Sequence, residues 1–332
     1  MTNKNLVLLS YGRESEYYRT IFCVLSFFAW TPRHKIDDVN VLIYTDNPFF
    51  FQEYFKDLKV EYVTLTETIL MEMMGDTDYI HRRKVGVIDL TFKAFPERDL
   101  LFVDSDTFFI HETDEMLDGF AENKSFMHKR EYNFEEGLAL FSSFGQGQYP
   151  EAFINYITDR EFVIGGSSER FSKYDYCWNS GVLGLDKSFA SYLPDIFKLV
   201  DEFYNNSHWF ISEQLAFALV LQKRTEIRPT DKFLLHYWGA RQKVLVDGLL
   251  KELFDRTSPA NFNDISFIRS VTKNWKNKIE LDLVLEQAVM AFSLGHLKYG
   301  LKKSVQVFLH FPTDVKVYKE LFCGIKRGSN KS

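Results

Sequence analysis

The sequence predicts an α/β protein with a mainly parallel sheet flanked by helices and with a helical C-terminal appendage. Up to about residue 235, short apolar runs alternate with segments of helical periodicity, as in strands joined by crossover helices. The run at residues 100–103 is apolar at every position, which indicates a strand buried on both faces. After residue 257 the sequence becomes helical and basic.

The expected elements follow one another in order. Residues 6–9 predict a strand that ends at Ser10, Tyr11 and Gly12, and apolar side chains at helical spacing from 18 to 28 predict a helix. Further strands are expected at 39–44, 60–65, 100–103, 182–185 and 233–235, and further helices at 85–95, 187–204 and 212–221. Ser212 is expected to cap the last of these helices. The Arg256–Pro259 segment is the expected boundary between a domain at 1–256 and a basic subdomain at 257–332.

The charge of the chain is unevenly distributed. Residues 268–332 carry 12 Lys/Arg against five Asp/Glu, a net +7, which leaves −13 for the other residues because the whole chain is at −6. We therefore expect an anionic partner for the C-terminal region, such as a membrane surface, and no nucleic-acid partner. Three distant cysteines and no signal-peptide pattern at the N-terminus predict a cytoplasmic protein, placed at the inner face of a membrane if the basic region makes that contact.

Two carboxylates directly follow the central apolar strand. Asp104 and Asp106 are separated by Ser105, and in extended backbone such residues point to the same side. The pair would lie at the carboxyl end of a strand, where α/β sheets bind ligands, and Mg²⁺ or Mn²⁺ prefers such oxygens. The alternative is a pair of solvated turn residues.

A second polar segment follows the strand expected at 233–235. His236 is suited to be a third ligand for Mn²⁺, and Gly239 would let backbone N–H groups approach a phosphate. Arg241 or Lys243 would neutralise a β-phosphate. The alternative is a structural histidine beside cations on a solvated loop.

A third candidate set lies between these segments. Asn179 precedes the strand at 182–185 and is expected to hydrogen-bond a sugar hydroxyl, with Gly181 leaving room for the sugar ring; an ordinary strand-initiating turn is the alternative. Glu213 and Gln214 begin the helix expected at 212–221, where compensation of the helix dipole would by itself explain the acid.

In this order, the motifs around Asp104, Asn179, Glu213 and His236 resemble those of family 8 glycosyltransferases and their relatives of the GT-A fold, over residues 5–245. The resemblance implies a nucleotide-sugar donor, usually UDP-linked, Mn²⁺ (or Mg²⁺) on Asp104, Asp106 and His236, and retention of the anomeric configuration. It further implies that Asn179, Glu213 and Gln214 line the sugar pocket. The nucleotide would contact Ser10, Tyr11, Gly12 and Ser105, and a basic residue among Arg82, Arg83 and Lys84 would approach the donor.

The sequence also departs from the family pattern. Glu213 stands where the family has Asp, and Gln242 stands where it has Lys, so that Arg241 or Lys243 would have to contact the phosphate. The acid that commonly follows the first strand is missing after Ser10, which leaves the base unassigned.

Several alternatives stay open on the sequence alone. An inverting mechanism would need a base, for which Asp175, Asp186 and Glu213 are candidates. A sugar-1-phosphate nucleotidyltransferase and a non-catalytic nucleotide-sugar-binding protein are the other functions considered, and the acceptor is a glycan or a lipid-linked molecule. The C-terminal region is either a helical subdomain with solvated lysines or a membrane contact. The residues expected in such a contact are Trp275, Lys276, Lys278, Lys302 and Lys303.

Overall fold

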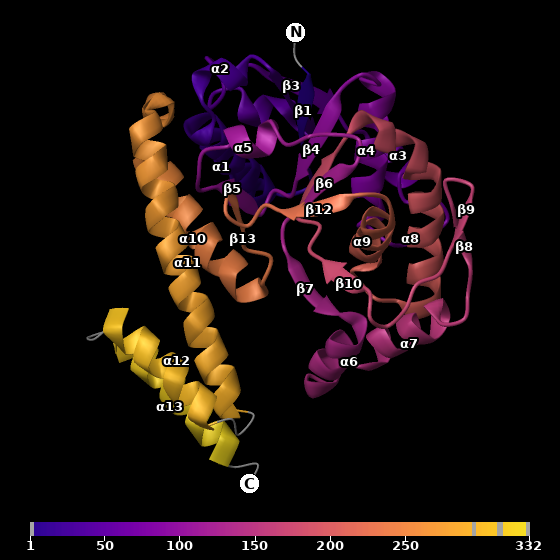
Figure 1. Cartoon of the computed structure of the whole chain (residues 1–332). Coiled ribbons are helices and arrows are strands. Elements are labelled where there is room, and N and C mark those ends of the chain that lie inside the picture. Colours follow the sequence, from indigo (N-terminus) through magenta and orange to yellow (C-terminus); the bar gives the residue numbers. More distant parts are fainter. Residues whose placement is uncertain (1–2, 294–296, 311–314, 330–332) are drawn as a thin grey trace. The chain divides into compact units, whose positions relative to one another are not determined.

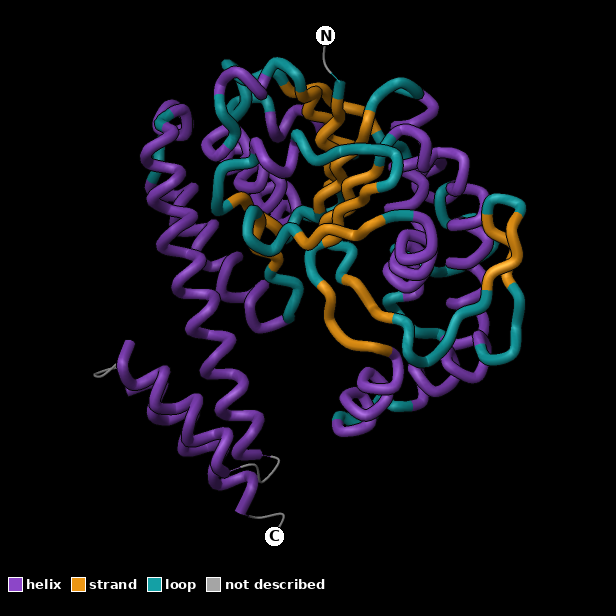
Figure 2. The backbone as a smooth tube through the Cα atoms, in the orientation of Figure 1, coloured by secondary structure: helices purple, strands orange, loops and turns teal. Residues whose placement is uncertain are grey.

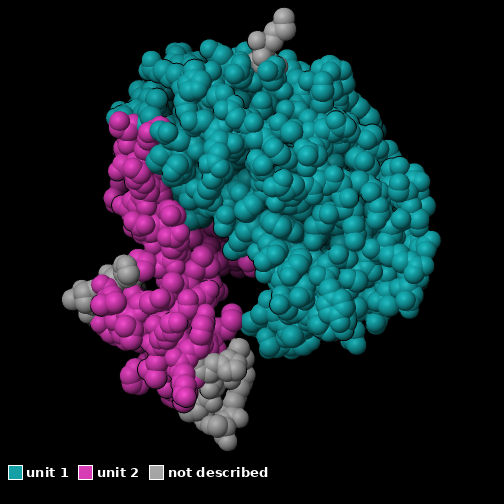
Figure 3. Space-filling view, viewed as in Figure 1, with its two compact units in different colours: residues 1–236, 258–265 teal, residues 237–257, 266–332 magenta. Residues whose placement is uncertain are grey.

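The structure is a computed structural model that describes residues 3–293, 297–310 and 315–329. The chain forms two compact units, which are coloured separately in Figure 3. The first comprises Met1–His236 and Ser258–Ile265, and the second comprises Tyr237–Thr257 and Ser266–Ser332. Every strand of the described residues belongs to the first unit.

A seven-stranded sheet in the order β12-β6-β11-β4-β1-β2-β3 forms the centre of the first unit (Figure 1). Strands β4, β1, β2 and β3 are parallel to one another, whereas β11 is antiparallel to both β4 and β6. Strand β12 pairs in parallel with β6. The bounds are β1 Lys4–Ser10, β2 Val39–Thr45, β3 Val60–Thr64, β4 Asp99–Val103, β6 Lys124–Met127, β11 Val182–Leu185 and β12 Glu226–Pro229.

Burial explains why the central strands are apolar. Every residue of β2 and every residue of β4 after Asp99 is buried, as expected where helices cover both faces of a sheet. The main helices are α1 Glu14–Trp30, α4 Arg82–Ala94, α8 Leu193–Ser207 and α9 Ser212–Arg224, and Figure 2 shows them around the strands. The predicted α/β class with a mainly parallel sheet is confirmed.

Many shorter elements complete the first unit, and most of them were not expected from the sequence. The segment between β4 and β11 contains several strands of three or four residues, which are too short to show a period. The additional strands are β5 Thr107–Phe109, β7 Arg130–Asn133, β8 Phe162–Ile164, β9 Ser167–Glu169, β10 Tyr176–Trp178 and β13 Leu234–His236. The additional helices are α2 Arg33–Ile36, η1 Pro48–Phe51, α3 Glu67–Glu72, α5 Asp114–Leu117, α6 Phe134–Ser143, α7 Gln148–Ile157, η2 Lys187–Tyr192 and η3 Pro259–Asn263.

Two expectations about helices are wrong. The single helix expected at 187–204 is divided into the 3₁₀ helix η2 and the α-helix α8, because Pro194 lies in the first turn of α8, where its fixed φ suits a helix start. Ser212 does not cap α9: its hydroxyl donates to the carbonyl of Trp209 at 2.6 Å, and Ile211 occupies the capping position without a side-chain hydrogen bond.

The second unit is helical, which confirms the predicted C-terminal appendage. Its helices are α10 Ala240–Arg256, α11 Ile265–Ser293, α12 Leu297–His310 and α13 Val315–Ser329. Leu285, Phe292, Val307 and Leu321 share a buried apolar cluster that joins the last three helices. None of the described helices is both long and apolar enough to span a membrane.

The division into units differs from the boundary expected near Arg256. Helix α10 groups with the C-terminal helices because the Arg241 guanidinium forms ion pairs with Asp282 of α11 at 2.6 Å and with Glu320 of α13 at 2.7 Å. Gln242 adds a hydrogen bond to Glu286 at 2.8 Å. The main segment of the first unit therefore ends at His236, the last residue of β13.

Candidate metal and donor site

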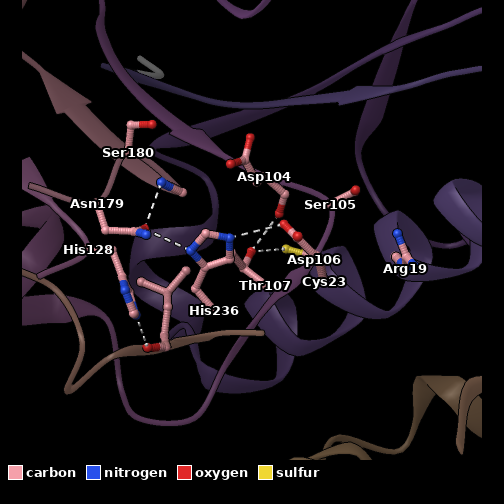
Figure 4. A network of polar contacts seen from close by, with 12 residues as sticks. Arg19, Cys23, Asp104, Ser105, Asp106, Thr107, His128, Asn179, Ser180 and His236 are labelled. Atoms are coloured by element: carbon pink, nitrogen blue, oxygen red, sulfur yellow. Dashed lines mark hydrogen bonds and ion pairs between the residues drawn. The ribbon is translucent and has the colours of Figure 1, made fainter. Parts of the chain in front are cut away.

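The three residues expected to hold a metal lie together in the first unit. One ligand atom from each of Asp104, Asp106 and His236 lies within 4.8 Å of the others, and Figure 4 shows the imidazole facing the acids. Strand β13 pairs with β5, which sets His236 opposite Thr107 and therefore next to Asp106. The antiparallel ladder thus joins residues that are about 130 positions apart in the sequence.

The local backbone at the acids differs from the extended form expected. Ser105 and Asp106 lie in a turn between β4 and β5, which the Thr107 hydroxyl closes by donating to the Asp104 carbonyl at 2.8 Å. The Asp104 N–H donates to the carbonyl of Gly181 at 2.9 Å, which ties the turn to β11. A closed turn, and not the pleat of a strand, gives the two carboxylates their common orientation.

The donor set fits a hard divalent cation. His236 Nε2 lies 3.2 Å from Asp106 Oδ1, and both side chains are more than nine-tenths buried. Adjacent ligands of an octahedral ion with bonds of 2.0–2.1 Å are separated by about 3 Å. Two carboxylates and one imidazole also match the ligand preferences of Mn²⁺.

Asn179 fixes the orientation of the histidine. The His236 Nδ1–H donates to Asn179 Oδ1 at 2.7 Å, so that Nε2 carries the lone pair that faces Asp106. The amide is itself held, because Oδ1 also accepts from the Gly181 N–H at 3.1 Å and Nδ2 donates to Glu131 Oε1 at 3.1 Å. This places Asn179 behind the candidate ligand, where hydrogen bonds commonly set the tautomer of a metal-binding histidine.

Gly181 makes room for the same ring. A Cβ atom at this position would lie 2.2 Å from His236 Nδ1, far inside van der Waals contact. The sequence suggested that Gly181 leaves space for a sugar ring. In the structure, the His236 imidazole fills that space.

A buried lysine lies on the other side of the acid pair. Lys84 Nζ donates to Asp104 Oδ2 at 3.0 Å and to the Ser180 carbonyl at 3.1 Å. Its ammonium also lies 3.4 Å from Glu213 Oε1, a distance that suits an ion pair, although the angle is not that of a hydrogen bond. Burial lowers the pKa of Lys84, but Asp104 and Glu213 outweigh it, and the net result is a raised pKa.

The structure separates the three basic residues that the sequence left open. Arg82 pairs with Asp201 at 2.7 Å, and Arg83 donates to the Tyr11 hydroxyl at 2.9 Å. Consecutive residues of a helix point about 100° apart, so that Lys84 alone of the three reaches Asp104.

Glu213 and Gln214 lie in the first turn of α9, beside Lys84 and Asn179. Burial raises the pKa of the Glu213 carboxyl to about 7, partly offset by the attraction of Lys84. The Ser180 hydroxyl donates to Glu213 Oε2 at 3.2 Å, and the Ser180 N–H donates to Gln214 Oε1 at 3.2 Å. The turn at 179–181 thus contacts the histidine, the lysine and the start of α9.

Two residues of this site were missed in the sequence. Glu131 of β7 accepts from Asn179 and, at 3.2 Å, from the amide of Gln214. The Tyr79 hydroxyl accepts from the Glu213 N–H at 3.0 Å and donates to the Phe210 carbonyl at 2.7 Å. Neither residue belongs to a recognisable motif, and only the tertiary contacts reveal them.

The other two candidate bases do not join the site. Asp186 follows β11, whose antiparallel register sets Leu185 opposite Leu100, so that Asp186 lies at the edge of the sheet opposite to Asp104. The Asp175 carboxylate accepts from the Ser172 N–H at 2.7 Å and lies 3.8 Å from Lys223. Of the three candidates, only Glu213 contacts the polar cluster.

The segment expected to contact the nucleotide forms a connected loop after β1. The Ser10 hydroxyl donates to the Glu16 carbonyl at 3.1 Å, and the Gly12 N–H donates to Asp46 Oδ2 at 3.0 Å. Ser105 donates to the Glu16 carboxylate at 2.6 Å, which links this loop to the acid pair. Gly12 has a φ of +84° and open space where a Cβ atom would lie.

The expected phosphate contacts after His236 belong to the second unit. The hydrogen bonds to Asp282 and Glu320 engage the Arg241 guanidinium and raise its pKa, so that this cation neutralises two acids of its own unit. Gly239 precedes α10, and a Cβ atom there would lie 1.9 Å from the side-chain oxygen of Gln242. Lys243 lies in the first turn of α10 and is half-buried.

Comparisons with known proteins find likeness only in structure. No family model matches the sequence, and no curated protein matches it. The galactosyltransferase LgtC, crystallised with donor and acceptor sugar analogues, is 12% identical with a TM-score of 0.42, and the match covers 74% of this chain and 95% of that one.

Two further solved structures are of the same degree of similarity. The glycosyltransferase GlyE of Streptococcus pneumoniae is 10% identical with a TM-score of 0.45, covering 84% of this chain and 64% of that one. A putative glucose-1-phosphate thymidylyltransferase of Bacillus anthracis is 11% identical with a TM-score of 0.38, covering 75% and 96%. The assignment to family 8 stays a prediction, and the chemistry of the site has to carry any functional conclusion.

Proposed function

We propose that this protein is a metal-dependent glycosyltransferase of the GT-A type, which transfers a sugar from a nucleotide-diphosphate donor to a glycan or lipid-linked acceptor. The observation that carries the proposal is the convergence of Asp104, Asp106 and His236 beside a buried cation and a buried acid. A divalent cation held by this acidic cluster would supply the positive charge that a departing diphosphate requires. The finer proposals are a UDP-linked donor, Mn²⁺ or Mg²⁺, and retention of configuration.

A bound divalent cation would neutralise the charge that develops on the departing diphosphate. Asp104, Asp106 and His236 would hold it, and Asn179 keeps the proton of the imidazole on Nδ1. Lys84 adds a second, enclosed positive charge that needs no reorganisation during the reaction. Asn179 thereby serves the ligand histidine, which replaces its expected role as a direct sugar contact.

Glu213 and Gln214 are the proposed sugar-facing residues. In a retaining reaction the acceptor hydroxyl attacks from the side of the leaving group, and these two side chains would stabilise the oxocarbenium-like carbon from the opposite side. Ser10, Tyr11, Gly12 and Ser105 are proposed to line the nucleotide. We assign no phosphate contact to Arg241, because its guanidinium joins helices of the second unit and touches no candidate metal ligand. Gly239 and Lys243 remain the proposed phosphate contacts.

A panel of nucleotide sugars tests the proposal. We expect the correct donor to raise the melting temperature only when Mn²⁺ or Mg²⁺ is present, with a stabilisation of about 2.7 kcal/mol at 100 times Kd. Asp106→Asn should abolish this effect while the variant remains folded. A metal-independent response to every donor would refute the proposal.

Product analysis distinguishes the competing reactions. Transfer or hydrolysis of the sugar releases a nucleoside diphosphate, whereas a sugar-1-phosphate nucleotidyltransferase exchanges pyrophosphate. NMR of the anomeric proton decides between retention and inversion, and an inverted product would exclude the family 8 mechanism.

Cys23 and Cys177 are buried free thiols, which supports a reducing, cytoplasmic site of action.

A further inference from the structure

Helix α12 of the second unit carries an exposed apolar stripe. Leu297, Leu301, Val305 and Leu309 follow one another at intervals of four residues and are 57%, 59%, 57% and 76% exposed. Residues at this spacing lie on one face of a helix. Four large aliphatic side chains in line form a patch of the kind that soluble surfaces rarely leave uncovered.

This stripe is not the face through which α12 packs within its unit. Ser304 and Val307 are buried, and a Cβ atom at Gly300 would lie 2.6 Å from the ring of Phe292 in α11. The packing face of α12 is therefore the one that carries Gly300, Ser304 and Val307. Leu301, Val305 and Leu309 lie on a different side of the helix, whereas Leu297 borders the packing face at the exposed start of α12.

Helix α13 repeats the arrangement. Val317 and Leu321 are buried in the cluster shared with α11 and α12, whereas Phe322 is 75% and Ile325 is 41% exposed. We call the six exposed residues, Leu297, Leu301, Val305, Leu309, Phe322 and Ile325, the apolar ridge.

The charges next to the apolar ridge are almost all positive. Helix α12 contains Lys298, Lys302 and Lys303 and no Asp or Glu. The only acid of α13, Glu320, pairs with Arg241 at 2.7 Å, while Lys319 and Lys326 are exposed. An amphipathic helix of this composition suits the interface of an anionic bilayer, where apolar side chains enter the acyl boundary and lysines meet lipid phosphates.

We propose that the apolar ridge and its flanking lysines dock the protein on an anionic lipid bilayer as a peripheral contact. A second copy of the chain is a poorer occupant, because two such surfaces would oppose lysine to lysine. The contact differs in part from the one expected from the sequence. Trp275 of α11 is buried and Lys276 lies 3.5 Å from Glu280, whereas the expected Lys302 and Lys303 lie on α12 and stay in the proposed contact. The proposal does not depend on the sugar-transfer activity.

Co-sedimentation of the full chain with vesicles tests the docking. We expect binding to vesicles of phosphatidylcholine with phosphatidylglycerol, little binding to phosphatidylcholine alone, and loss of binding as salt shortens the range of the charges. Equal binding to both vesicles, or binding to neither, would overturn the proposal.

Two pairs of variants separate the apolar and the charged contributions. Leu301→Gln/Leu309→Gln should lower the partition coefficient at least about tenfold, and its control is Met71→Gln/Val163→Gln, which changes two apolar residues that are 60% and 58% exposed in the first unit. Lys298→Gln/Lys302→Gln should lower it about 25-fold, or about fivefold for each lysine, with Lys56→Gln/Lys59→Gln as its control.

Independent measurements keep the outcomes distinct. Circular dichroism verifies that each variant is folded, and donor hydrolysis in the absence of vesicles should be unchanged in all four. If Leu301→Gln/Leu309→Gln binds vesicles like the wild type, or if it only converts a dimer to a monomer in light scattering, the ridge does not face lipid. If the wild type hydrolyses no donor, that result would contradict the proposed enzymatic activity and would leave the docking result intact.

Discussion

Two buried or half-buried cations of this molecule have similar partners and different surroundings. Lys84 in the first unit contacts Asp104 and Glu213, and Arg241 in the second contacts Asp282 and Glu320. The side chain of Lys84 is 8% exposed and that of Arg241 is 34% exposed. The lysine lies among candidate metal ligands, whereas the arginine connects three helices. A cation between two acids is therefore not a functional signal until its neighbours are known.

The largest expected effect separates the two cations by activity. Lys84→Met should reduce kcat by about 10² to 10³, the usual cost of losing one preorganised electrostatic group. Arg241→Met should leave kcat within about twofold, because its charge is neutralised within its own unit. Steady-state rates with the donor found by thermal shift measure both, and equal losses would erase the distinction.

Removal of the support behind the histidine should weaken metal binding. We expect Asn179→Ala to lower the affinity for Mn²⁺ by about 10- to 100-fold, because the imidazole loses the partner that fixes its tautomer. Electron paramagnetic resonance of free Mn²⁺ gives this affinity without any turnover. A direct sugar contact would instead raise the KM of the donor at unchanged Mn²⁺ affinity, and that pattern would refute the positioning role.

The next effect is on stability, for which we expect Arg241 to matter although it does not matter for the rate. Arg241→Met removes the ion pairs that join α10 to α11 and to α13. It should lower the free energy of unfolding by about 1–2 kcal/mol, a modest loss because these ion pairs are partly solvated. Lys243→Met, a neighbouring cation of the same helix, is the control. Urea unfolding followed by circular dichroism measures the change, and an unaltered midpoint would argue against the connecting role.

The smallest expected effect concerns the two hydrogen bonds of the Tyr79 hydroxyl to the backbone at the start of α9. Tyr79→Phe deprives the Glu213 N–H and the Phe210 carbonyl of their partner. This should lower the free energy of unfolding by about 1 kcal/mol. We expect a slightly lower kcat with unchanged Mn²⁺ affinity. Tyr204→Phe is the matched control, because that ring stacks on Tyr79 at 4.4 Å and its hydroxyl is not part of these two hydrogen bonds.

The sequence predicts those parts of the fold that depend on local pattern. The buried strands at 39–44 and 100–103, the helix that became α1 and the helical C-terminal region follow from periodicity and apolar runs. The acids at 104 and 106 could be found because a strand leads into them. The strand expected at 233–235 corresponds to β13, whereas short strands such as β5 and β8 could not be found, because three residues show no period.

The roles of individual side chains depend on contacts that no local pattern encodes. Asn179 was expected at a sugar, and its partner proves to be His236, 57 positions later. Arg241 was expected at a phosphate, and its partners lie 41 and 79 positions away. No sequence pattern marks Glu131 or Tyr79, since their hydrogen bonds form only when β7 and the start of α9 are in place. The role of a polar residue in a folded core depends on its hydrogen-bond and ion-pair partners, and the sequence does not show which residues become partners.

The pairing of β13 with β5 has a consequence for the folding of the nascent polypeptide. Because the imidazole is supplied by residue 236 and its ladder partner by residue 107, a nascent chain that has emerged only as far as residue 230 presents the two acids without their third companion. The proposed metal site therefore stays incomplete until more than two thirds of the polypeptide has left the ribosome and this last short ladder has closed.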